Sequence, residues 1–128
     1  MKDFGYATDN AGWTHSDRPI VLWSPDGAKI ATFRQDQRFV GDMHLVDTRV
    51  GHPVLRSWKY PLPGDPVIPM VHRVVIDVAA RRVTPLRVAP DAHRTLSCDD
   101  LVCGGTWGDT QWGADSATLA FVSMSRDH

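Results

Sequence analysis

Serine, histidine and aspartate, the three residue types of a nucleophilic triad, are all present in this chain of 128 residues. The nucleophilic serine of an α/β-hydrolase lies in a Gly-x-Ser-x-Gly turn between a strand and a helix. None of the seven serines lies in that context, and Ser24, for example, stands between Trp23 and Pro25. We therefore expect no catalytic residue within this chain.

The acidic side chains could also act as general acids, general bases or metal ligands. All 15 of them are aspartates, because the sequence contains no glutamate. Zinc sites of the His-Glu-x-x-His type are therefore excluded, and so is the calcium loop of an EF-hand, which closes on a glutamate. Glycosidase mechanisms that depend on a pair of glutamates are excluded as well.

Cys98 and Cys103, with His93 close by, are the residues that could bind a metal ion. Their spacing lies at the loose end of zinc-ligand spacings, and no second pair completes four ligands, so we expect no metal ion and no cofactor. The two cysteines could instead form a disulfide, if Asp99 and Asp100 make a turn that brings their Cα atoms within about 7 Å. Free thiols are the alternative, and the sequence leaves both open.

Basic residues gather in one part of the sequence. The cluster consists of four arginines: Arg73, Arg81, Arg82 and Arg87. Asp77 and Asp91 are close to them in the sequence, so we interpret the cluster as a solvated, partly ion-paired face. The net charge of −1 argues against a nucleic-acid partner, which would require a strongly basic face.

The elements that must position these residues are predicted to be β-strands. Valine occurs 14 times and threonine nine times, whereas lysine, a good helix former, occurs only three times. Nine prolines and ten glycines divide the chain into short segments. No apolar run approaches the roughly 18 residues that would suggest a membrane span. We expect an all-β fold of antiparallel sheets with a loop over 1–19, an extended connector over Pro61–Pro69, and strands over Ile20–Trp23, Lys29–Arg34, Met43–Thr48, Val54–Tyr60, Val71–Val78, Val83–Val88, Leu101–Trp107 and Thr118–Met124.

Two segments of the sequence resemble each other. The segment WSPDGAKIATF begins at Trp23, and WGADSATLAF begins at Trp112. Each has a tryptophan, a tight turn with an aspartate, and a strand with an apolar-alanine pair followed by phenylalanine. A repeated tryptophan turn that leads into a strand is typical of β-propeller blades. We predict that Asp26 and Asp115 lie in tight turns and that both tryptophans are at least half buried.

Five segments, WSPDGAKIATF, LVDTRVGHP, WKYPLPGD, RVVIDV and WGADSATLAFVSMSRD, resemble the N-terminal propeller of bacterial dipeptidyl peptidase IV. These enzymes are serine exopeptidases of the prolyl oligopeptidase clan, and the resemblance extends from about Phe4 to His128. It implies a β-propeller followed by an α/β-hydrolase domain. This chain would then cover one to two blades: an elaborated blade over 20–88 with an insertion near Pro61–Pro69, and the start of the next blade over 89–128.

The resemblance implies a non-catalytic function, in which the propeller segment gates and positions peptide substrates for a hydrolase domain outside this sequence. Its partners would be the peptide substrate, that hydrolase domain and the remaining blades, and the parent enzyme is expected to be periplasmic or otherwise exported. In the family, paired glutamates that bind the amino terminus of the substrate precede the Trp-Ser-Pro turn, but this chain has no glutamate. We expect Asp9, Asn10 and Trp13, in the corresponding region, to lie near the substrate.

Two alternative functions share these sequence features. The chain could be a stand-alone β module that binds a partner through a strand edge, or part of a TolB-like propeller without peptidase activity. A downstream Gly-x-Ser-x-Gly motif would favour the peptidase. Self-association is also expected, because Val71–Val78 is a largely apolar strand and an exposed edge of such a strand pairs readily with another chain.

Overall fold

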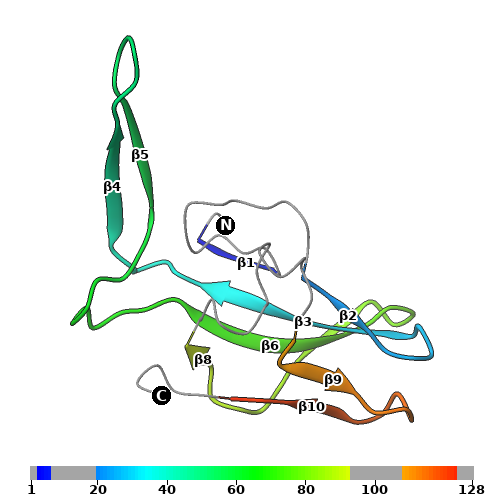
Figure 1. Ribbon diagram of the computed structural model, residues 1–128. Coiled ribbons are helices and arrows are strands. Elements are labelled where there is room, and N and C mark those ends of the chain that lie inside the picture. Colours follow the sequence, from blue (N-terminus) through cyan, green and yellow to red (C-terminus); the bar gives the residue numbers. More distant parts are fainter. Residues whose placement is uncertain (1–2, 7–19, 93–107, 124–128) are drawn as a thin grey trace.

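The computed structural model describes residues 3–6, 20–92 and 108–123. All regular structure in these residues is β-strand and every strand pair is antiparallel, so the predicted all-β class is confirmed. The strands form one six-stranded sheet and two separate hairpins (Figure 1). In chain order they are β1 (Phe4–Tyr6), β2 (Leu22–Trp23), β3 (Lys29–Asp36), β4 (Asp42–Asp47), β5 (Val54–Lys59), β6 (Met70–Asp77), β7 (Arg82–Pro85), β8 (Asp91–Ala92), β9 (Thr110–Trp112) and β10 (Leu119–Phe121).

The six-stranded sheet is four strands wide. Its central strands β3 and β6 pair along their whole length, from Lys29 opposite Asp77 to Asp36 opposite Met70. Strands β2 and β1 pair one after the other with the outer edge of β3. Strands β7 and β8 share the outer edge of β6 in the same way. Each edge of this sheet is therefore built from two short strands.

The chain leaves the sheet between β3 and β6 to form the hairpin β4–β5, which we call the arm. The arm stands away from the sheet in Figure 1, and within the part of the chain that the structure describes its two strands pair only with each other. The sequence predicts both strands correctly. The sequence places the insertion near Pro61–Pro69. In the structure, the inserted segment begins directly after β3 with the arm, and the proline-rich connector is only its last part. The prolines identify the connector, but they do not indicate that the hairpin before the connector belongs to the insertion.

Two further expectations are corrected by the strand pairing. Phe4–Tyr6, within the predicted loop over 1–19, is a strand, because three residues show no period in the sequence and gain their structure from pairing with β3. The apolar pattern of Val71–Val78 suggests an exposed strand edge, but β6 pairs with β3 on one side and with β7 and β8 on the other. An apolar pattern identifies a strand without identifying its neighbours.

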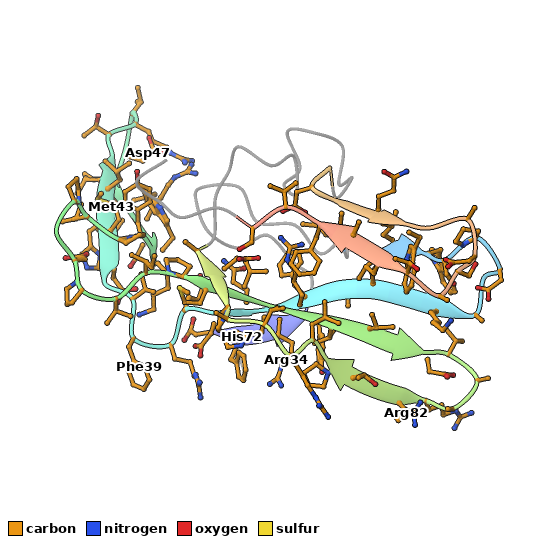
Figure 2. All side chains as sticks on the ribbon, turned by 90° about the horizontal axis from the view of Figure 1, so that it is seen from below. Arg34, Phe39, Met43, Asp47, His72 and Arg82 are labelled. Atoms are coloured by element: carbon orange, nitrogen blue, oxygen red, sulfur yellow. The ribbon has the colours of Figure 1, made fainter. Side chains whose placement is uncertain are left out.

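The two faces of the sheet differ in what covers them. Side chains alternate between faces along a strand, and directly paired residues share a face. One face, which we call the core face, carries Ala31 and Phe33, and hairpin β9–β10 packs on it. The other, which we call the second face, carries Trp23, Arg34 and His72, and between them Thr32 and Val74, which are each only 1% exposed. Figure 2 shows Arg34 and His72 projecting from the side of the sheet opposite to hairpin β9–β10.

The hydrophobic core lies between the core face and hairpin β9–β10. Its buried residues come from the segment before β2 and from the two central strands, and the hairpin adds partly buried apolar side chains. The buried members are Ile20, Ala31, Phe33 and Val71, and Leu22, Trp112 and Leu119 pack around them. The core therefore joins two parts of the chain that are about 90 residues apart in the sequence.

Candidate functional site

The turn between β2 and β3 is fixed by its own hydrogen bonds. The amide of Ser24 donates to the carbonyl oxygen of Lys29 (2.9 Å), and the amide of Gly27 donates to the carbonyl oxygen of Ser24 (2.8 Å). Gly27 has a φ of +69°, a conformation that glycine adopts without steric cost. Hydrogen bonds from the Ser24 hydroxyl (2.6 Å) and the Ala28 amide (3.0 Å) to Asp26 Oδ1 hold the pKa of Asp26 below its ordinary value.

The turn between β9 and β10 repeats this arrangement at an offset of 89 residues. The amide of Gly113 donates to the carbonyl oxygen of Thr118 (2.8 Å), and the amide of Ser116 donates to that of Gly113 (3.0 Å). Ser116, at the position of Gly27, has a φ of +54°. Hydrogen bonds from the Ala117 amide (3.0 Å) and from the amide and hydroxyl of Thr118 lower the pKa of Asp115. The predicted repeat and both aspartate turns are confirmed.

The two turns are bonded to each other. The amide of Asp26 donates to Ser116 Oγ (3.1 Å), and Lys29 Nζ donates to the carbonyl oxygen of Ser116 (2.8 Å). The same ammonium lies 6.0 Å from the ring centroid of Trp112, within the range of a cation–π interaction. Hairpin β9–β10 is therefore held to the sheet at the turn as well as in the core.

The two tryptophans of the repeat have different surroundings. Trp112 is more than half buried, packs against the core and donates from Nε1 to the carbonyl oxygen of Leu22 (3.0 Å). Trp23 is 52% exposed, so the prediction of burial is correct for Trp112 and wrong for Trp23. The reason is that Trp112 faces the core between the sheet and hairpin β9–β10, whereas Trp23 lies on the opposite face of the sheet.

A buried arginine makes the strongest polar link between sheet and hairpin. Arg73, on β6, pairs with Asp91 through Nε (2.9 Å) and with Asp109 through Nη2 (2.8 Å). It also donates to Thr110 Oγ1 (2.8 Å) and lies 4.6 Å from the ring centroid of Phe121. Burial opposes the charge on Arg73, but the bonds to Asp109 and Asp91 outweigh it and raise the pKa of Arg73.

This network corrects one interpretation of the sequence. The sequence suggests a solvated face of four arginines, but only Arg81, Arg82 and Arg87 are exposed, and Arg73 is buried. Arg73 points to the core face, where its charge is neutralised by two carboxylates. The sequence also does not identify Asp109 and Ser116 as contact residues. Each contacts a residue far away in the sequence, and neither composition nor periodicity predicts such contacts.

A cavity of about 480 Å³ lies between the core face and the hairpin. Its lining is mostly apolar, and neither serine nor histidine nor cysteine contributes to it. The apolar wall includes Val75, Leu86, Leu119 and Phe121, and the rim carries Lys29, Asp77, Arg82 and Arg87. The cavity therefore offers no serine or cysteine nucleophile, although Lys29, Asp77 and Thr84 contribute to its lining.

Several predicted site residues lie outside the described residues. These are the substrate-proximal candidates Asp9, Asn10 and Trp13, and the Cys98, Cys103 and His93 group. Within residues 3–6, 20–92 and 108–123, no group of three or more histidine, cysteine or acidic side chains could hold a metal ion. No helix in those ranges is long and apolar enough to cross a membrane.

An all-β chain that repeats a tryptophan turn and stacks the second copy on the first has the arrangement of consecutive β-propeller blades. Residues 5–128 match the family model for the dipeptidyl peptidase IV (DPP IV) N-terminal region, and the chain belongs to this family. A search of the curated proteins gave no match. The family assignment thus agrees with the resemblance found in the sequence.

Proposed function

We propose that this chain is a non-catalytic part of the β-propeller of a DPP IV-like serine exopeptidase, where it gates and positions peptide substrates for a hydrolase domain outside this sequence. The observation that carries the proposal is the stacked pair of tryptophan turns, in a chain that belongs to the DPP IV N-terminal region. The sequence has no Gly-x-Ser-x-Gly turn, which supports assigning peptide cleavage to another part of the enzyme.

A gate that selects peptides must keep a fixed shape. The contacts between the six-stranded sheet and hairpin β9–β10 favour such a fixed shape. The core, the turn-to-turn bonds of Ser116 and the Arg73 network join the sheet to hairpin β9–β10 at three separate points. Removing one partner of a buried ion pair is strongly destabilising, so such a network favours one relative placement of the two parts. This supports a scaffolding role.

The candidate substrate contacts lie in the connection between β1 and β2. These two strands follow each other along the same edge of β3. Connections between the strands of a rigid scaffold commonly carry binding residues. We place Asp9, Asn10 and Trp13 in contact with the peptide, with Asp9 as the acidic group for its free amino terminus.

The full gene product and X-Pro dipeptide p-nitroanilides provide the test. We expect cleavage of the substrate with a free amino terminus, little cleavage of its N-acetylated form, and no cleavage of the same dipeptide at the amino terminus of a folded protein. Trp13→Ala should raise KM several-fold with kcat almost unchanged, and Phe39→Ala, in an exposed loop, should change neither. A gene product without turnover would contradict the proposed function, whereas an unchanged KM for Trp13→Ala would contradict only the substrate site.

A second candidate function is self-association through the arm. Its cross-strand pair Val46 and Leu55 is 59% and 64% exposed on one face, and no strand among the described residues pairs with either outer edge of the arm. Exposed apolar pairs on a free two-stranded ribbon are typical of interaction surfaces. This would make the chain an interaction module whose partner is a second copy.

Sedimentation velocity at tens of micromolar tests the arm. Self-association that is abolished by Val46→Lys and by Leu55→Lys, but not by Val83→Lys on β7 of the sheet, would support this second function. A monomeric wild-type protein, or association that all three variants weaken equally, would rule it out.

A further inference from the structure

Strand β1 comes directly before the connection to which we assign the peptide contacts. Asp9, Asn10 and Trp13 follow shortly after Tyr6, the last residue of β1. The contacts that hold β1 against the sheet therefore fix the point at which this connection begins. Strand β1 has only three residues, so its backbone pairing with β3 is short, and side-chain contacts must supply much of its attachment.

The side chain of Phe4 lies at the centre of that attachment. The guanidinium of Arg34 lies 3.8 Å from the centroid of its ring, and the guanidinium of Arg38 lies 4.5 Å from the same point. Both distances are well within the range of a cation–π interaction. The ring of His72 also packs edge-on against Phe4, with 6.1 Å between the two centroids. We call Phe4, Arg34 and Arg38 the arginine clamp.

The two arginines of the clamp are held in place in different ways. Arg38 donates from Nε (2.9 Å) and Nη2 (2.7 Å) to the two carboxylate oxygens of Asp36, and these bonds hold the pKa of Asp36 below its ordinary value. Arg34 has no carboxylate partner among the described residues, and its buried Nε has no hydrogen-bond acceptor there. Its guanidinium is instead oriented by the rings of Phe4 and Tyr6, the second at 5.3 Å.

The other end of the connection is anchored by burial. Ile20, just before β2, is 3% exposed and belongs to the hydrophobic core, and its carbonyl oxygen accepts a hydrogen bond from Thr32 Oγ1 (2.9 Å). Outside its strand pairing, β1 has one backbone bond at its start, from the amide of Gln37 to the carbonyl oxygen of Asp3 (2.9 Å), and the clamp. Because a partly exposed cation–π contact contributes less than the burial of an isoleucine side chain, the clamp is the weaker of the two anchors.

We infer that Phe4, Arg34 and Arg38 are positioning residues for peptide binding, because the clamp holds β1 on the sheet and so fixes the start of the connection that binds the peptide. The inference rests on the proposed function, since it concerns the same peptide site. The apparent affinity for a ligand falls with the fraction of the protein that holds the binding-competent conformation. A weaker clamp should therefore raise KM and leave kcat unchanged, because the hydrolase domain carries out the cleavage.

Fluorinated phenylalanines at position 4 of the full gene product test the clamp. Fluorine withdraws electron density from the face of the ring and so weakens a cation–π contact with little change in ring size. For an X-Pro dipeptide p-nitroanilide, we expect KM to rise stepwise from mono- to trifluorophenylalanine, by roughly two- to five-fold in all, with kcat unchanged. The same series at Phe121, which lies 4.6 Å from Arg73, should lower the Tm and leave KM unchanged. A series at position 4 that changes only the Tm would overturn the inference.

Arginine variants test the two cations of the clamp separately. Arg34→Gln and Arg38→Gln should each raise KM, and Arg34→Gln should have the larger effect because its guanidinium lies closer to the ring. Arg38→Lys should recover part of the loss, since it keeps the charge. The control is Arg49→Gln, because Arg49 pairs with Asp47 at the same two-residue spacing but lies over no aromatic ring among the described residues. An equal rise in KM for Arg49→Gln and Arg38→Gln would contradict the role of the ring contact.

Hydrogen exchange of the full gene product gives a measurement that does not depend on turnover. Phe4→Leu keeps an apolar side chain but removes the ring, so we expect the backbone amides of β1 to exchange at least about tenfold faster, with hairpin β9–β10 unchanged. Unchanged exchange in β1 would overturn the inference. If Trp13→Ala raises KM and the Phe4 variants do not, only the clamp is wrong. A gene product without turnover would overturn the proposed function and this inference together.

Discussion

Ser116 Oγ accepts a hydrogen bond from the amide of Asp26, so the turn of one tryptophan hairpin is bonded directly to the turn of the other. Ser116 stands where the first turn has Gly27, and its left-handed backbone conformation places it at the contact. A glycine at this position would have no hydroxyl to accept that bond. The replacement of glycine by serine at this position of the second turn therefore accounts for one of the bonds between the two turns.

Replacement of Ser116 by alanine should weaken the contact between the hairpins. Both side chains tolerate the same backbone conformation about equally, so the change removes the hydroxyl and leaves the backbone strain unchanged. We expect a loss of about 1 kcal/mol in the free energy of unfolding. Urea denaturation measures it, and Ser57→Ala, an exposed serine on β5, is the control that should change little. Equal stabilities of the two variants would show that the Asp26 amide bond contributes nothing.

Replacement of Arg73 by methionine should have a much larger effect. It leaves the carboxylates of Asp91 and Asp109 close to each other without a cation, and we expect destabilisation by about 3–5 kcal/mol. The matched control is Arg82→Gln, an exposed arginine on the edge strand β7, which should stay within about 0.5 kcal/mol of wild type. A small effect of Arg73→Met in chemical denaturation would contradict the network as a structural link.

The lowered pKa values of the two turn aspartates predict that the thermal stability of the protein decreases at low pH. Hydrogen bonds lower the pKa of both Asp26 and Asp115 in the folded protein, so each carboxylate contributes stability above the unfolded-state pKa of about 4. That contribution is lost as the pH falls through the folded-state pKa. Thermal melts between pH 2.5 and 7 should show a falling Tm below about pH 4, and the Asp26→Asn and Asp115→Asn variants should show a flatter profile. A profile unchanged in both variants would contradict this assignment.

The chain by itself should not hydrolyse peptides. Purified residues 1–128 should release no p-nitroaniline from X-Pro or X-Ala dipeptide substrates, because the sequence has no nucleophile turn. Turnover that a serine-directed phosphonate abolishes would show that a nucleophile is present after all. Turnover that the phosphonate leaves intact would point to a contaminating peptidase of another class.

Features that depend on adjacent residues could be predicted from the sequence. The Asp26 and Asp115 turns follow from local turn chemistry, and the strand at Lys29–Arg34 follows from its alternation, so both appear where expected. The exposure of Trp23 and the burial of Arg73 depend on which sheet lies against which face. The sequence pattern shows two equivalent repeats, but the order in which they stack becomes visible only in the structure.

The split edges of the six-stranded sheet have a consequence for solubility. Strands β1, β2, β7 and β8 are each four residues long or shorter, so neither side of the sheet presents a long continuous row of free amide and carbonyl groups. Amyloid-like stacking requires a ladder of about six residues or more. An incoming chain could therefore pair with only a few residues at each edge of this sheet. Strand β6, which carries Val71, Val74, Val75 and Ile76, lies inside the sheet between β3 and the edge strands β7 and β8.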